Sequence, residues 1–92
     1  MIKQITSSAN PLIKDIRALE RKRHRAESRL FVAEGARLAL EAEEMGVYPK
    51  TLLFSSEALE RPAVRDLVAR MDAAGVDCVE TNQRLLSQIT RR

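Results

Sequence analysis

Residues 50–80, KTLLFSSEALERPAVRDLVARMDAAGVDCVE, decide the fold class of this chain. The runs KTLLFSS and VDCVE have the length and apolar content of buried strands. Between them, Pro62 stands at a favourable first helical position, apolar residues follow at helical spacing, and Gly75 supplies a helix stop. A strand, a helix and a second strand in this order predict a parallel pair joined by a right-handed crossover.

The same alternation extends outward over the rest of the 92 residues. Asn10 as a cap and Pro11 as the first helical residue predict a basic helix over about residues 10–25. We further expect a buried strand at 30–34 (LFVAE), a helix at 36–46 that stops at Gly46, and a last helix at 81–90. The predicted order α-β-α-β-α-β-α indicates one α/β domain, 1–92, with a mostly parallel sheet covered on both faces. Because another strand would normally follow the last helix, we expect a domain boundary there.

Positive charge is concentrated in the first third of the chain. Residues 1–37 carry a net charge of +5 and residues 38–92 a net charge of −2, which together give +3. Such asymmetry is typical of proteins that bind a polyanion, most often nucleic acid. A solvated helix face would carry the same charge, and charge alone does not choose between these readings.

The basic residues of the first predicted helix fall into a stripe. At about 100° per residue, a helix places Lys14, Arg17, Arg21 and Arg25 along one side, opposite its apolar residues, over about 16 Å. Arg23 falls on the apolar side, so the helix is expected to leave its support after Leu19 or to fray there. The stripe is long enough for several phosphates.

The junction at Glu34 and Gly35 is a second candidate contact, because backbone N–H groups at a helix N-terminus can bind a phosphate. A tight turn at Gly35 and a helix-terminal charge at Glu34 are the plainer reading. Phe31, Tyr48 and Phe54 are the only aromatic residues, and two of them lie in predicted core strands, so base stacking is a weak prospect.

No constellation for catalysis or metal binding is present. His24 is the only histidine and lies among cations, without the partners that a triad or metal site requires. Cys78, the only cysteine, lies within an apolar run and is expected to be a core residue, so no intrachain disulfide can form. No signal peptide or membrane span is recognisable, and we expect a cytoplasmic location.

The residues quoted so far match a known family pattern. S-x-x-N-P-x-I-K, a basic helix, and F-x-x-E-G-x-R resemble the N-terminal substrate-binding domain of SpoU-type (TrmH-like) RNA 2′-O-ribose methyltransferases. The pattern residues here are Ser7, Asn10, Pro11, Ile13, Lys14, Arg25, Phe31, Glu34, Gly35 and Arg37.

The resemblance implies a small three-layer α/β/α sandwich similar to the kink-turn-binding ribosomal proteins. It implies a domain that binds structured RNA, chiefly ribosomal RNA, and presents it to a separate C-terminal SPOUT domain. That catalytic domain would bind S-adenosylmethionine and form a homodimer, and its motifs are absent from these residues. No catalytic, cofactor or metal residue is therefore expected in this chain.

Two hypotheses of function follow. In the first, the chain recognises RNA for a methyltransferase, and the contacts are Lys14, Arg17, Arg21, Arg25, Gly35 and Arg37. In the second, it is a protein-interaction module whose basic helix docks an acidic partner or the rest of its own chain. Under the first hypothesis, the residues expected in the core are Ile13, Ile16, Leu19, Phe31 and Val32.

Overall fold

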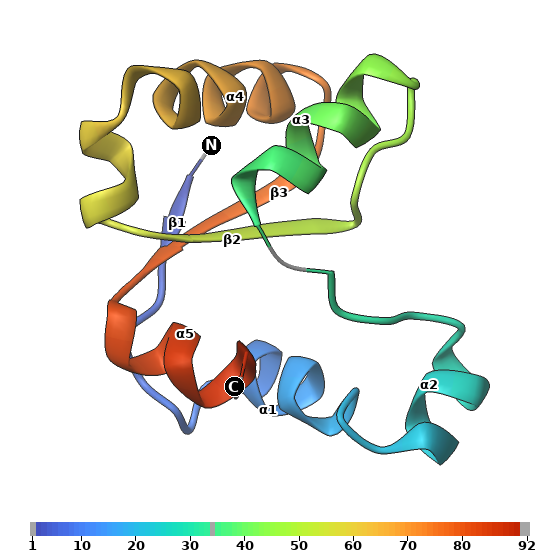
Figure 1. The fold of residues 1–92 in the computed structure, drawn as a ribbon. Coiled ribbons are helices and arrows are strands. Elements are labelled where there is room, and N and C mark those ends of the chain that lie inside the picture. The colour runs from blue at the N-terminus through green and yellow to red at the C-terminus, as the bar shows by residue number, and fades with distance from the viewer. Residues whose placement is uncertain (1, 34, 91–92) are drawn as a thin grey trace.

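The computed structural model describes residues 2–33 and 35–90, and within them a sheet lies between two layers of helices (Figure 1). The strands are β1 (Lys3–Gln4), β2 (Thr51–Ser55) and β3 (Asp77–Thr81). The helices are α1 (Pro11–Ala18), α2 (Lys22–Ser28), α3 (Ala36–Glu44), the 3₁₀ helix η1 (Glu57–Glu60), α4 (Pro62–Ala73) and α5 (Gln83–Thr90).

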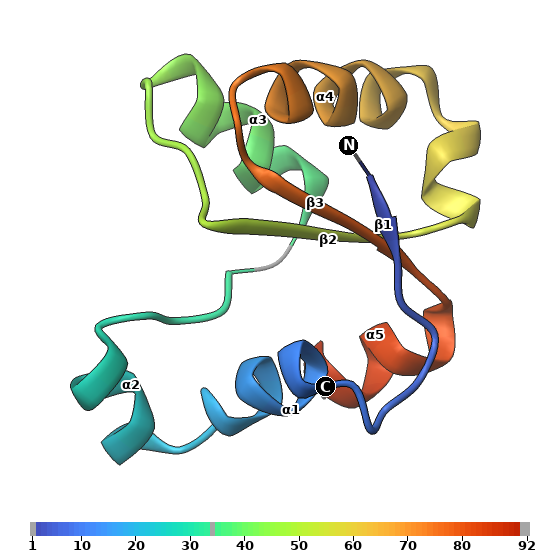
Figure 2. The same cartoon turned by 180° about the vertical axis from the view of Figure 1, so that it is seen from behind.

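The sheet is parallel throughout, in the order β1-β3-β2. Val79 in the central strand β3 is level with Lys3 of β1 on one side and Leu53 of β2 on the other. Figures 1 and 2 show α3 and α4 over one face of the sheet and α1 and α5 over the other. The predicted three-layer α/β/α sandwich is therefore confirmed.

The main core lies between the sheet and α4. Leu67, Val68 and Met71 of α4 are at most 2% exposed and pack with Phe54, Val64, Val76 and Cys78. The opposite face of the sheet buries Ile13 of α1 and Leu85 of α5. Alternation along β3 explains both layers, because neighbouring residues of a strand point to opposite faces. The buried Cys78 thiol confirms the core position expected for it, and burial raises its pKa.

The predicted helix over residues 10–25 is wrong in its length, because α1 ends at Ala18 and α2 begins at Lys22. Arg21 between them has an extended backbone, with φ −85° and ψ 128°. The break lies just beyond Leu19, where Arg23 on the apolar side had indicated the end of helical support. The start of α1 is as predicted, since the Asn10 side chain accepts a hydrogen bond of 2.9 Å from the Leu12 N–H.

The predicted strand at 30–34 is also wrong for residues 30–33, which are irregular, while Glu34 lies outside the described residues. Phe31 is 76% exposed and Val32 42% exposed, so neither is a core residue. The apolar residues at 30–33 fit the pattern of a buried strand, but a strand also needs a neighbouring strand with which to form hydrogen bonds. β1, a pair of residues too short to show a pattern, pairs with β3 instead.

The remaining helices confirm their predicted start and stop signals at Gly46, Pro62 and Gly75. Asn82 accepts a hydrogen bond from the Leu85 N–H and so caps α5. Apolar side chains of α3 and of the residue that follows it remain largely accessible to solvent: Leu38 is 46% exposed and Met45 is 79% exposed. Within the described residues no helix is long and apolar enough to span a bilayer.

Candidate nucleic-acid interface

Two basic residues project from α1 because the packing of this helix fixes its rotation. Ile13 is fully buried and Ile16 half-buried, which turns Lys14 and Arg17 outward to solvent. Asn10 caps the helix and Pro11 starts it, so its N-terminal end is well determined. Both cations are exposed, as a residue that contacts phosphate must be.

The break after α1 gives Arg25 a structural role that the sequence did not reveal. Its Nη1 donates hydrogen bonds to the carbonyl oxygens of Leu19, at 2.9 Å, and Glu20, at 2.8 Å. A cation at this place satisfies carbonyls left unpaired at the helix end and complements the helix dipole. Arg25 is half-buried, whereas Arg21 is exposed. The four predicted stripe residues are consequently not aligned on one helix.

Gly35 and Arg37 belong to the other side of the sheet. Gly35 has φ +110°, a conformation that favours glycine, and its carbonyl accepts from the Ala39 N–H at 3.2 Å. Arg37 in the first turn of α3 is almost fully exposed, and its Nε lies 3.5 Å from Oε1 of Glu41. Figure 1 shows α3 and α1 in different layers, so this pair is separate from Lys14 and Arg17.

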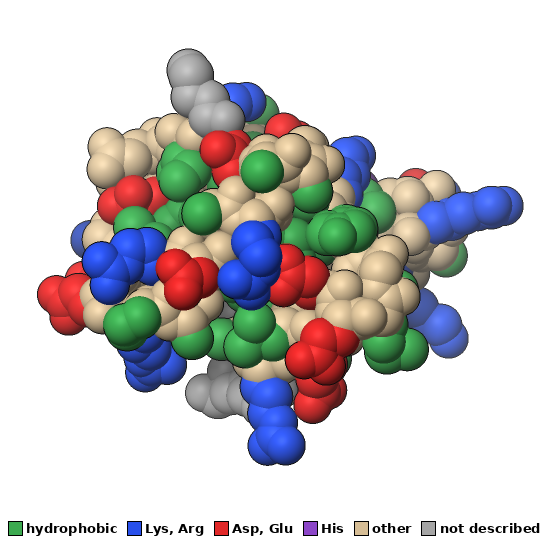
Figure 3. Space-filling view, turned by 90° about the horizontal axis from the view of Figure 1, so that it is seen from above, with side chains coloured by type: hydrophobic (Ala, Val, Ile, Leu, Met, Phe, Trp, Pro, Cys, Tyr) green, Lys and Arg blue, Asp and Glu red, His purple; other side chains and the backbone are tan. Residues whose placement is uncertain are grey.

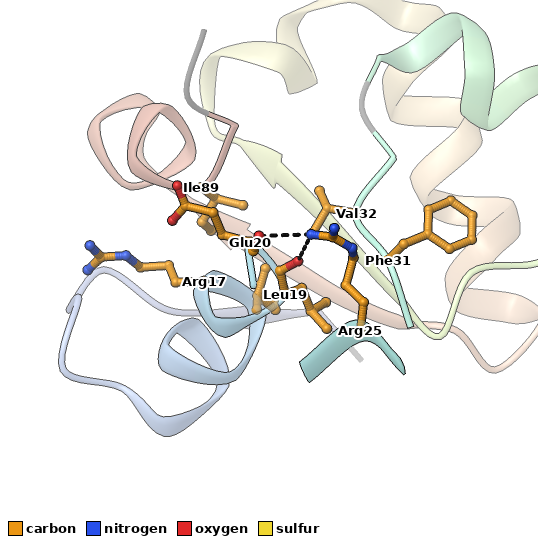
Figure 4. A pocket seen from close by; sticks show the side chains of 8 residues that line it. Arg17, Leu19, Glu20, Arg25, Phe31, Val32 and Ile89 are labelled. Carbon is orange, nitrogen blue, oxygen red and sulfur yellow. Dashed lines mark hydrogen bonds between the residues drawn. The ribbon is translucent and has the colours of Figure 1, made fainter. Parts of the chain in front are cut away.

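Arg17 and Arg25 meet at one cleft of about 400 Å³ beside the break between α1 and α2. Its lining also includes Glu20, Phe31 and four aliphatic side chains, namely Ile16, Leu19, Val32 and Ile89. Figure 4 shows Arg25 between Arg17 and Phe31, with dashed bonds to the two carbonyls. Lys14 and Arg21 are outside this lining. Sequence analysis missed Phe31 here, because the run around it resembles a core strand.

The face over α3 and α4 has a different character. Figure 3 shows Lys and Arg side chains there interspersed with Asp and Glu. One pair links the two helices: Arg70 donates to both carboxylate oxygens of Glu43 at 2.9 Å. These bonds hold the pKa of Glu43 below its usual value and raise that of Arg70. Among the described residues, no group of three or more His, Cys, Asp or Glu side chains is placed to hold a metal ion.

Comparison with known proteins fits this architecture. The sequence model of the MRM3-like substrate binding domain matches residues 10–92. The chain belongs to this family. The resemblance inferred from the sequence is thereby confirmed. No significant match was found among curated proteins.

Two solved structures are similar to this substrate-binding domain over nearly its whole length. They are a crystal structure of an rRNA methyltransferase from Sinorhizobium meliloti and one of an AdoMet-bound rRNA methyltransferase from the same organism. Each shares 42% identity with a TM-score of 0.84 and covers 99% of this chain. This chain spans 32% of the length of each.

Proposed function

We propose that this domain binds structured ribosomal RNA and presents it to the catalytic domain of a SpoU-type 2′-O-ribose methyltransferase. The observation that carries the proposal is the family match, together with 42% identity to an rRNA methyltransferase over 99% of the chain. The parent protein would be a cytoplasmic homodimer. Its catalytic domain would bind S-adenosylmethionine and supply the methyl group, while the residues of this domain position the RNA.

The basic segment from Lys14 to Arg21 supplies the contacts to the RNA backbone in this proposal. Lys14, Arg17 and Arg21 are exposed, and none of the hydrogen bonds or ion pairs described here occupies their charged groups. Guanidinium and ammonium groups release condensed counterions when they neutralise phosphates, so affinity falls with salt. Arg37 and the Gly35 backbone would contact a second part of a folded RNA, because they lie on another layer of the domain.

The test is the salt dependence of binding to a structured ribosomal RNA fragment, measured by fluorescence anisotropy. Three phosphate contacts predict that affinity falls about 20- to 40-fold between about 50 and 200 mM salt. Changing Arg17→Glu and Arg21→Glu together should weaken binding at least about tenfold, since two contacts become repulsive.

The matched control changes Arg61→Glu and Arg65→Glu at the start of α4, on the opposite side of the sheet. The two double variants therefore have the same net charge and differ only in where the charge is changed. We expect this control to bind within about twofold of the parent domain, because long-range charge effects are screened over about 10 Å. Equal losses in the two double variants would reject the placement of the interface. Full RNA affinity without Arg17 and Arg21 would favour the docking of an acidic protein by the basic segment.

A further inference from the structure

We infer that the cleft beside the α1–α2 break binds one unpaired nucleotide of the RNA, with its base stacked on Phe31. The inference rests on the proposed function and adds a ligand class to it. Whereas Lys14, Arg17 and Arg21 would read the phosphate backbone, this site would read a base taken out of its stack. The size of the cleft, its guanidinium groups and its exposed aromatic ring carry the argument.

The cleft has the composition of a small-ligand site. Its volume of about 400 Å³ lies in the range of ligand pockets, and its aliphatic lining comes from three separate elements. Ile16 and Leu19 belong to the α1 end, Val32 to the irregular segment, and Ile89 to α5. Such a lining gives the nucleotide an apolar wall beside Arg25 and excludes water from that side of it.

Phe31 supplies an exposed aromatic ring beside Arg25, at one end of the lining. A phenylalanine that is 76% exposed contributes little to the core, and its neighbours Leu30 and Val32 are exposed as well. Figure 4 shows its ring directed away from Arg17, on the far side of Arg25. Unpaired bases in RNA are bound by stacking on such aromatic side chains, which is sequence-tolerant because every base has a π-face.

The guanidinium group of Arg25 is held in place between the Phe31 ring and Arg17. Its Nη1 is used by the carbonyls of Leu19 and Glu20, and within residues 2–33 and 35–90 no acceptor is described for Nε or Nη2. A guanidinium plane held in this way is preorganised to donate to a phosphate. The backbone of the bound nucleotide would pass Arg25 and continue toward Arg17.

The experiment uses the absence of tryptophan from the sequence, so that Phe31→Trp introduces a single tryptophan, whose fluorescence can be excited selectively. Two RNAs of equal length are compared, a hairpin with an unpaired loop and a fully paired duplex. We expect the loop RNA to quench the tryptophan and the duplex to leave it unchanged. Tyr48→Trp, at a residue 51% exposed beyond α3, is the matched control and should show no quenching.

Affinity measurements complete the test. Phe31→Ala should weaken binding of the loop RNA about 5- to 50-fold, with duplex binding unaltered, and Phe31→Tyr should restore it. Because the ring is exposed, the alanine variant should unfold at the same urea concentration as the parent. Undiminished binding of the loop RNA by Phe31→Ala, alongside salt-dependent binding by the parent domain, would overturn the nucleotide site and leave the proposed function standing. Failure of the parent domain to bind either RNA would reject both the nucleotide site and the proposed function.

Discussion

The hydrogen bonds of Arg25 to the end of α1 can be tested quantitatively through the stability of the domain. We predict that Arg25→Ala lowers the free energy of unfolding by about 1–2 kcal/mol. The variant loses two charge-assisted hydrogen bonds, to the carbonyls of Leu19 and Glu20 at 2.9 and 2.8 Å. A hydrogen bond to a charged group is worth about 1.5–3 kcal/mol when buried. The expected loss is smaller here because the side chain is only half-buried, and water can reach the carbonyls in the variant.

The assay is urea denaturation followed by circular dichroism, with thermal unfolding as a second readout. For a domain of this size, a loss of 1–2 kcal/mol corresponds to a fall in melting temperature of about 4–16 °C. The slope of the unfolding free energy against urea should not change, because the surface exposed on unfolding is nearly the same.

Arg21→Ala is the matched control. Arg21 lies four residues earlier in the same basic run, is exposed, and has no side-chain hydrogen bond to α1. Its replacement should alter the free energy of unfolding by less than about 0.5 kcal/mol. Equal stabilities of the Arg25→Ala and Arg21→Ala variants would refute the view that Arg25 closes the end of α1.

Two further predictions concern the opposite side of the sheet. Met71→Ala should lower the free energy of unfolding by about 2–5 kcal/mol, because Met71 is completely buried on the side of α4 that faces the sheet, whereas Arg65→Ala on the exposed face of that helix should change it little. Urea midpoints measure both, and similar midpoints would contradict the described core. Glu43→Gln should remove a stabilisation whose pH dependence follows from the lowered pKa of Glu43. That stabilisation is fully present above the unfolded-state pKa of about 4.3 and is lost as the pH falls through the lower folded-state pKa. The difference in urea midpoint between parent and variant should therefore shrink on acidification from pH 7 to below 4, and a constant difference would show that the Arg70 pair does not act through charge.

Local signals in the sequence were sufficient for most helices. Asn10 with Pro11, Pro62, and Gly75 fix helix ends through backbone geometry that depends on only a few neighbouring residues. The strands at β2 and β3 were also predictable, because their apolar runs are bounded by turn residues and are buried as expected. The parallel arrangement then followed from the alternation of strands and helices.

The errors concern features that depend on distant partners. Residues 30–33 are apolar enough for a strand but find no neighbouring strand, and β1 is found only through its pairing with β3. For the site, exposed Lys14 and Arg17 agree with the charge pattern, because the burial of Ile13 orients α1. The cleft could not be predicted, because it depends on a bend after Leu19 that brings Arg25 back onto the preceding carbonyls.

The pairing of β1 with β3 has a consequence for how the domain forms during translation. Gln4 donates to Glu80 across 76 positions of the chain, so the first strand to be synthesised is among the last to find its neighbour. Closing so long a loop costs entropy before any contact compensates for it, which slows folding. On the ribosome, the segment from β2 to β3 could form its strand–helix–strand unit while the N-terminus is still unpaired. A chain stalled before Glu80 would hold α1 without the completed sheet against which it packs.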